Sequence, residues 1–354
     1  MKCSKKINSL EALNNAHALA IAPFLFQASS CLLKFGILSF LEDSGKNGAS
    51  LAAVVEHTKL TEYAVETLLQ IALALNLVEH KEGNYYLAKT GWFLLNDPLV
   101  KVNFAFTRDV CYRGLENLDK SFLEQRPAGL ESLGNWPTIY PALTTLPEPA
   151  RKSWFDFDHF YSDAAFKDLA KYVLEHFAPK KIFDVGGNTG KWSMLYASMD
   201  PTVEIKIHDL PEQCLVAKKN IQQHGLSSQI STVALDVLKI KSFPYSDADV
   251  WLMSQFLDCF HKDEITSILK KVRMNLAPNS RLLILEPFIG NQPFEIGDLC
   301  LAAMSLYFTA IANGTSRFYQ VSEFEKCIED AGLVIEEEVG PLGTGHTLLI
   351  CRTK

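Results

Sequence analysis

The sequence lacks any regular cysteine pattern. None of its eight cysteines forms a Cys-x-x-Cys pair or a zinc-type spacing, so we expect no metal site. Scattered cysteines of this kind are typical of free, mostly buried thiols in a reducing compartment, and the expected localisation is cytoplasmic. They stand at positions 3, 31, 111, 214, 259, 300, 327 and 351.

An excess of positive charge is also missing. The 34 lysines and arginines are outnumbered by 41 acidic residues, which gives a formal net charge of −7. Phosphate binding normally requires a clustered basic surface. Nucleic acid is therefore not an expected partner.

No uninterrupted apolar run of membrane-spanning length is present. Three lysines among the first six residues are followed by a polar stretch, so we expect no signal peptide. Residues 17–41 are apolar enough to raise the question of a bilayer span, but polar residues and a proline interrupt them. We expect helices buried in a dimer interface and no membrane span. The interrupting residues are Pro23, Gln27, Ser29, Ser30 and Lys34.

A glycine turn between an apolar run and a helix is the strongest motif. Residues 181–191 read KIFDVGGNTGK, in which Gly186, Gly187 and Gly190 allow the backbone to approach a ligand closely. Backbone N–H groups at the start of the following helix favour polar or anionic ligand atoms. Such turns also occur where nothing binds. The G-G-x-x-G spacing after Asp184 differs from the dinucleotide fingerprint and favours S-adenosylmethionine over a nicotinamide cofactor.

Two further acids follow the next apolar runs. Asp209 ends the run that begins at Val203, about twenty residues after the glycines, where a carboxylate can accept hydrogen bonds from both ribose hydroxyls. Asp236 ends another run and is expected to meet the adenine edge, with Val237 packed on its face. The alternative for each acid is a helix N-cap or a turn residue. Acids at three consecutive strand ends favour the cofactor reading.

The pattern of apolar and turn residues predicts the secondary structure of the rest of the chain. We expect a helix over about residues 10–41, broken near Pro23, then a helix pair over 50–58 and 61–76 and a hairpin with its turn at 82–84. From residue 166 onward, strands alternate with helices, which is typical of a doubly wound parallel sheet. With 354 residues, two domains are the default expectation.

The order of these motifs resembles a known family. The segments DVGGNTG, HDLP, ALDV, DADVWLMSQFLDCF and LLILEP are similar to those of S-adenosylmethionine-dependent small-molecule O-methyltransferases of the caffeate, acetylserotonin and bacterial polyketide type. The resemblance covers nearly the whole chain. Residues 74–95 match the end of the family's winged helix, and residues 158–166 match a helix that lies over its cofactor.

The resemblance implies a division into three parts. Residues 1–97 would form a winged-helix-like, mainly helical dimerisation domain, and residues 98–165 a helical connector that contributes to the acceptor pocket. Residues 166–354 would form a Rossmann-like α/β domain that binds S-adenosylmethionine. It also implies a homodimer, and Leu210 and Ser254 complete the expected cofactor set.

The catalytic positions depart from the family pattern. Where the family has a histidine after its fourth strand, this chain has Asp258, while Glu286 matches a family carboxylate that helps to orient the base. Asp258 has an alternative role as a helix N-cap, and His261, a substitute base, has one as a solvated first-turn residue. His159 and His346 are further candidates.

Proton affinities make the missing histidine important. Moving a proton from a phenol to an ordinary Asp is uphill by roughly 8 kcal/mol, against about 5 kcal/mol for a His. Three alternatives remain open. Burial beside Glu286 raises the pKa of Asp258, His261 substitutes for it, or the acceptor needs no such base.

Apolar side chains at helical spacing are expected to form the acceptor pocket. Met304, Tyr307 and Phe308 fall in the segment that lines the acceptor in the family, although such a stripe is usually plain core. Trp136 and Tyr140 are expected on the opposite side. Aromatic walls suit a planar aromatic or polyene-linked acceptor.

The sequence thus predicts a homodimeric enzyme of secondary metabolism that moves a methyl group from S-adenosylmethionine to an aromatic small molecule. C-methylation of a phenolic ring is a variant of this prediction. The alternative is a cofactor-binding protein that has lost methyl transfer and acts as a structural partner or catalyses another reaction. A winged-helix regulator and a nicotinamide enzyme are more distant alternatives.

Overall fold

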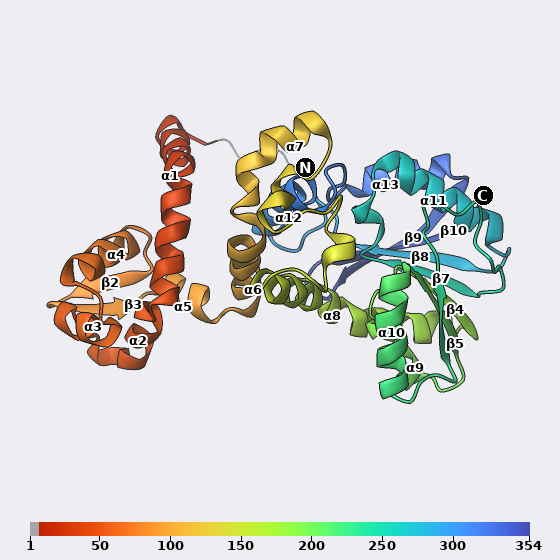
Figure 1. The fold of residues 1–354 in the computed structure, drawn as a ribbon, viewed down its shortest axis with the longest axis horizontal. Helices are drawn as coiled ribbons and strands as arrows, with labels where there is room; N and C mark the ends of the chain where they lie inside the picture. Colours follow the sequence, from red (N-terminus) through yellow and green to blue (C-terminus); the bar gives the residue numbers. More distant parts are fainter. Residues whose placement is uncertain (1–6) are drawn as a thin grey trace. The chain divides into compact units, whose positions relative to one another are not determined.

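A computed structural model describes residues 7–354 of the chain, so Cys3 and the three N-terminal lysines lie outside the described part. The chain forms two compact units, one ending at Arg108 and one running from Asp109 to Lys354 (Figure 1). Each unit has its own sheet. The predicted division at residues 97 and 165 stays a prediction, and one continuous helix spans residues 150–176.

The N-terminal unit is mainly helical, with a small antiparallel sheet in the order β1-β3-β2. Its elements are α1 (Ser9–Lys34), α2 (Ile37–Ser44), η1 (Gly45–Asn47), β1 (Ala49–Ser50), α3 (Leu51–Thr58), α4 (Glu62–Ala74), β2 (Val78–Lys81), β3 (Asn84–Leu87), α5 (Lys89–Asn96) and α6 (Pro98–Phe106).

The predicted helix pair and hairpin are present in this unit. Ser50 and Thr61 are the N-caps of α3 and α4, and each side chain accepts a hydrogen bond from the backbone three residues on. Glu82 and Gly83 join β2 to β3 with positive φ angles of 50° and 81°, as a two-residue hairpin turn requires.

The predicted break near Pro23 is wrong. Helix α1 runs through Pro23 and ends at Lys34, and Gly36 then adopts φ 70° before α2 begins. A proline removes one backbone donor, but it does not turn the chain when the residues on both sides stay helical. The left-handed glycine does turn it, since the N–H groups of Phe35 and Gly36 then bond back to the last carbonyls of α1.

The C-terminal unit contains a seven-stranded sheet in the order β6-β5-β4-β7-β8-β10-β9. Strand pairs from β6 to β8 are parallel, whereas β10 is antiparallel to both β8 and β9. Its strands are β4 (Lys181–Val185), β5 (Glu204–Asp209), β6 (Ile230–Ala234), β7 (Val250–Ser254), β8 (Arg281–Glu286), β9 (Leu333–Leu342) and β10 (His346–Thr353).

Helices cover both faces of this sheet, and an irregular helical segment precedes it (Figure 1). The helices are η2 (Thr107–Cys111), η3 (Gly114–Asn117), α7 (Leu118–Glu124), η4 (Ala128–Ser132), η5 (Tyr140–Ala142), α8 (Ala150–His176), α9 (Lys191–Met199), α10 (Pro211–Gln223), η6 (Leu257–Cys259), α11 (Lys262–Asn275), α12 (Glu295–Tyr307), η7 (Phe308–Ala312) and α13 (Val321–Asp330).

Alternation along the strands builds two hydrophobic layers. Ile182 of β4 packs with α8, α9 and α10 on one face of the sheet. Its neighbours Phe183 and Val185 pack with α11 and α13 on the other face. Both layers are mainly apolar, although the buried ring of His208 packs against Phe183 and Trp251. The predicted doubly wound α/β fold is confirmed.

The strand order reverses beside β4. Strands β5 and β6 follow on one side of β4, while β7 and β8 follow on the other. The loops after β4 and β7 must therefore leave in opposite directions, and a crevice opens at the carboxyl ends of these strands. This is the edge at which the predicted acids lie.

Two segments among residues 7–354 are long and apolar enough to cross a bilayer by length and composition alone. One is α1, and the other comprises residues 295–312 of α12 and η7. The expectation of no membrane span stays a prediction.

Gly91 in α5 offers a test of the packing of the N-terminal unit. A Cβ on Gly91 would lie 2.1 Å from the backbone carbonyl oxygen of Leu77. We expect Gly91→Ala to lower the free energy of unfolding by about 1–3 kcal/mol, since the backbone must shift. Urea denaturation measures the loss. Thr90→Ala on the exposed side is the control, and equal stability of the two variants would contradict this packing.

Candidate functional site

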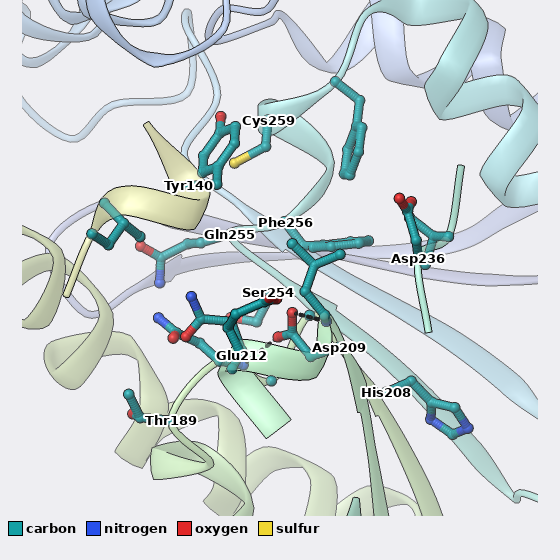
Figure 2. A pocket seen from close by; sticks show the side chains of 18 of the residues that line it. Tyr140, Thr189, His208, Asp209, Glu212, Asp236, Ser254, Gln255, Phe256 and Cys259 are labelled. Atoms are coloured by element: carbon teal, nitrogen blue, oxygen red, sulfur yellow. Dashed lines mark hydrogen bonds between the residues drawn. The ribbon is translucent and has the colours of Figure 1, made fainter. Parts of the chain in front are cut away.

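A cavity of about 860 Å³ opens at the carboxyl edge of the sheet, beside the reversal point (Figure 2). This volume is near the upper end of the range for small-molecule sites, about 300–1,000 Å³. Gly190 lies off its wall as the N-cap of α9, with φ 79°. The predicted cofactor residues that line the cavity are Asp184, Gly186, Gly187, Asp209, Leu210, Asp236, Val237 and Ser254.

The turn after β4 is held closely to its neighbours. A Cβ on Gly186 would lie 2.1 Å from the ring of Phe256, and one on Gly187 would lie 2.7 Å from Asp184 Oδ2. Asp184 is buried, and it accepts a hydrogen bond from the Ser193 hydroxyl at 2.5 Å. Burial raises the pKa of Asp184 to about 7, although this hydrogen bond acts to lower it. Asp184 thus ties the glycine turn to α9.

Asp209 is oriented by two backbone donors. Its carboxylate oxygens accept hydrogen bonds from the N–H groups of Leu210 at 2.7 Å and Asn188 at 2.8 Å (Figure 2). Burial raises the pKa of Asp209 to about 6, against the effect of these donors. The carboxylate is fixed beside the glycine turn, where it can accept hydroxyl donors from a ligand.

Asp236 is more exposed and carries its charge. It accepts a hydrogen bond from the Leu238 N–H at 2.9 Å and forms an ion pair with Lys239 at 2.9 Å. Burial acts to raise its pKa, but the bonds to Lys239 and Leu238 leave the pKa below its usual value. Val237 beside it lines the cavity.

Four residues that line the cavity each have a buried polar atom without a hydrogen-bond partner among the described residues. These atoms are Trp192 Nε1, His208 Nε2, Ser254 Oγ, at the end of β7, and Gln255 Nε2, in the next position. Buried polar groups are nearly always paired in folded proteins. The presence of Ser254 and Gln255 on the wall, next to Asp209, fits a polar ligand such as S-adenosylmethionine (Figure 2).

A second part of the wall is aromatic. Tyr140 lies beside Cys259 (Figure 2), and the Asn313 amide donates to the Tyr140 hydroxyl at 3.2 Å. Trp154 lines the same region, and its indole N–H donates to the Tyr307 hydroxyl at 2.7 Å. This wall offers flat apolar surface with few polar groups.

Asp258 and Glu286 form a buried acidic pair behind the wall. They are 6% and 1% exposed, and neither lines the cavity. Glu286 Oε1 accepts hydrogen bonds from the N–H groups of Phe256 at 3.0 Å and Leu257 at 2.8 Å. Burial raises both pKa values, that of Asp258 to about 7; repulsion from Asp158 also acts to raise the pKa of Asp258, and repulsion from Asp258 acts to raise that of Glu286. The burial considered for Asp258 from the sequence is therefore present.

The histidine candidates lie in three different settings. His261 is the N-cap of α11, in a capping box with Glu264, and its side chain is half exposed. His346 is fully buried in β10, and its ring nitrogens have no partner among the described residues. Of these three candidates, His159 on α8 lines the cavity, as does a further histidine, His208 of β5. The catalytic roles predicted for Asp258, Glu286 and His261 stay predictions, and none of the three reaches the wall.

The predicted acceptor residues lie away from the cavity wall. Met304, Tyr307, Phe308 and Trp136 are absent from its lining, and Tyr307 and Phe308 are buried. Within α12 only Leu301 and Tyr307 are buried, and the acceptor role predicted for the four residues named above stays a prediction. Tyr140 does line the cavity, as predicted.

Sequence reasoning missed several wall residues. Asp158 and Trp154 on α8 line the cavity, as do Gln255 and Cys259 in the segment after β7. The first two carry a weak signal, since they lie in or beside the segment expected over the cofactor. Gln255 and Cys259 carry no such signal, because the comparison with the family pattern pointed to their neighbours Ser254 and Asp258 instead.

Family models match both units of the chain. A Dimerisation2-like domain matches residues 14–85, and an O-methyltransferase domain matches residues 163–334, together more than half of the chain. The chain belongs to the S-adenosylmethionine-dependent O-methyltransferases. This methyltransferase uses S-adenosylmethionine as its methyl donor. Methyl transfer is thereby favoured over a protein that has lost it.

Individual relatives agree with this family. Demethylspheroidene O-methyltransferase of Rhodobacter capsulatus is 26% identical over 317 residues, covering 86% of this methyltransferase and 73% of that protein. Bacteriochlorophyllide d C-20 methyltransferase of Chlorobaculum tepidum is 22% identical, covering 75% of each chain. The S-adenosylmethionine-dependent methyltransferase SibL has the same fold, with a TM-score of 0.75 at 20% identity over 96% of this chain and 99% of that one.

The acidic pair of the methyltransferase predicts a pH-dependent stability. A carboxyl whose pKa is raised on folding stabilises the protein when protonated, and this contribution is lost as pH rises through its folded pKa. For Asp258 the loss falls between about pH 4 and 7. As the pH rises from 5 to 8, the native protein loses this contribution and Asp258→Asn does not. We therefore expect the free energy of unfolding of Asp258→Asn to rise by about 2–3 kcal/mol relative to that of the native protein over this interval.

Urea denaturation at the two pH values measures this difference. Asp247→Asn, which removes an exposed carboxylate paired with Lys181, is the control and should show no such gain. A stability difference between native protein and Asp258→Asn that is the same at both pH values would contradict a raised pKa.

Proposed function

We propose that the enzyme transfers a methyl group to a hydroxyl of a small aromatic acceptor. The observation that carries this proposal is one cavity with two kinds of wall. Three carboxylates from consecutive strand ends line one part, and Tyr140 and Trp154 line another. A polar cofactor and a flat apolar acceptor can therefore meet in a single space.

The cofactor part of the wall is assigned to named residues. Asp209 would accept hydrogen bonds from the ribose hydroxyls, and Asp236 with Val237 would hold the adenine. The glycine turn at Gly186 and Gly187 would leave room for the methionine portion. When bound, S-adenosylmethionine supplies a methyl group on a positively charged sulfur.

The chain's own task is alignment and proton removal. An in-line displacement requires the acceptor oxygen to stand close to the methyl carbon, and fixed walls supply this positioning. Glu286 contributes indirectly, since it holds the backbone of Phe256 and Leu257 in the loop that forms the wall. The aromatic side chains exclude water from the reacting atoms.

O-methylation is favoured by the relative named demethylspheroidene O-methyltransferase. C-methylation is a second candidate, because another relative is named as a C-20 methyltransferase. Regiochemistry separates the two: transfer to oxygen removes a phenolic hydroxyl from the product, whereas transfer to carbon leaves it in place.

Secondary metabolism and a cytoplasmic location are part of the proposal.

Asp209 provides the direct test of the cofactor assignment. We expect Asp209→Asn to weaken binding of S-adenosylhomocysteine by about 10- to 100-fold, since hydrogen bonds to a charged acceptor are lost. Isothermal titration calorimetry measures the affinity. Asp247→Asn is the matched control and should bind as the native protein does. Unchanged affinity in Asp209→Asn would sink the ribose assignment.

Homodimerisation is supported by the exposed apolar face of α1. The family model for residues 14–85 is a dimerisation domain, and several large apolar side chains of α1 are exposed. Contiguous apolar surface of this kind usually marks an interface. The exposed side chains on this face are Leu10, Leu13, Ile21 and Phe24, whereas Leu19 is exposed on the opposite side of the helix.

Phe24, 73% exposed, is the most informative position for a test. We expect Phe24→Asp to halve the solution mass measured by light scattering, because a charge would be buried in the interface. Glu11→Gln on the same helix is the control. A native protein that is monomeric, or a variant that stays dimeric, would contradict an interface built on α1.

A further inference from the structure

Asp158 on α8 is a partly buried acid that the assignments above leave unused. It lines the cavity, yet it forms no hydrogen bond or ion pair with the described residues. The three cofactor acids, by contrast, each accept at least one hydrogen bond from the chain. A carboxylate that faces a cavity without a protein partner points to a role toward a ligand.

One face of α8 presents Asp158 to the aromatic part of the wall. Trp154, Asp158, Ser162 and Phe166 all line the cavity, and their four-residue spacing puts them on one side of the helix. Trp154 precedes Asp158 by one turn. Asp158 therefore stands beside the surface assigned to the acceptor ring.

Several titratable groups surround Asp158. Burial raises its pKa to about 6, Lys191 on α9 acts to lower it, and Asp163 on its own helix acts to raise it. Asp258 in η6 repels it, and Tyr307 of α12 and His159 next to it complete its polar surroundings. Asp158 is thus mostly ionised at neutral pH.

We propose that Asp158 is the catalytic base that takes the proton from the acceptor hydroxyl. This inference rests on the proposed function. The O–H proton moves to the Asp158 carboxylate, and the oxygen electron pair forms the bond to the methyl carbon. The carbon–sulfur bond breaks with its electron pair left on sulfur, which gives neutral S-adenosylhomocysteine.

Access to the cavity favours Asp158 over Asp258 for this step. Asp158 lines the cavity, whereas Asp258 lies behind Cys259 and does not. Compared with an ordinary Asp, the raised pKa of Asp158, about 6, also reduces the pKa difference from a phenol (pKa about 10) from about six units to about four. Asp158 remains ionised enough to accept a proton at neutral pH.

The test compares Asp158→Asn and Asp158→Glu with the native protein. Labelled S-adenosylmethionine is the donor, and 1-naphthol and umbelliferone are the acceptor probes. We expect Asp158→Asn to lower kcat at least 100-fold and to lose the decline of kcat below about pH 6, while affinity for S-adenosylhomocysteine stays within twofold. Asp158→Glu should recover part of the rate. Asp156→Asn, an exposed acid paired with Lys152 on the same helix, is the matched control and should keep full activity.

Two results would overturn the inference. One is an Asp158→Asn variant with native kcat at saturating acceptor, even if KM rises, since Asp158 would then only position the acceptor. The other is loss of cofactor binding in this variant, which would make Asp158 part of the cofactor site.

A binding measurement separates this inference from the proposed function. Native protein that transfers no label to either probe would count against the proposed function. The affinity of the S-adenosylhomocysteine-loaded protein for 1-naphthol is then compared at pH 5 and 8. We expect about tenfold tighter binding at pH 8, because an ionised Asp158 is the stronger acceptor, and no such change in Asp158→Asn. The same pH dependence in both proteins would refute Asp158 as the proton acceptor.

Discussion

The hydrogen bonds from Phe256 and Leu257 to the buried carboxylate of Glu286 are the constraint on which the site depends. They fix the loop after β7 so that the Phe256 ring lies against Gly186, where any side chain would collide with it. The loops after β4 and β7 are thereby held together at the reversal point of the sheet. The cavity exists between them because neither loop can move without leaving a buried acid unpaired.

The acids around the cavity divide by what they contact. Asp184 is bonded to Ser193 and ties the glycine turn to α9, so its contribution is to the shape of the turn. Asp209 and Asp236 are oriented by backbone donors and keep capacity for a ligand. Asp258 and Glu286 lie behind the wall. Carboxylates around one cavity thus differ in their burial and in their hydrogen-bond partners, and these set their pKa values.

Different residues of α8 line the cavity and pack against the sheet. Its cavity-facing residues recur every four positions, while Ala165, Leu169 and Val173 further on pack into the sheet. One helix therefore supports the core at its carboxyl half and the reaction space at its amino half. The arrangement gives Asp158 a rigid support, which a loop residue would lack.

The sequence by itself determined the α/β sheet, the glycine turn and the three acids at its strand ends, because strand patterns and turn chemistry are local properties. It also determined the small N-terminal hairpin, through the positive φ required at Glu82 and Gly83. Only the tertiary structure decided which side chains reach the cavity. Tyr307 and Phe308 have acceptor-like spacing yet are buried, whereas Asp158 and Cys259 line the wall although the sequence patterns assigned neither of them a role. The reason is that a side chain's access to a cavity depends on how distant segments pack, which no local pattern encodes.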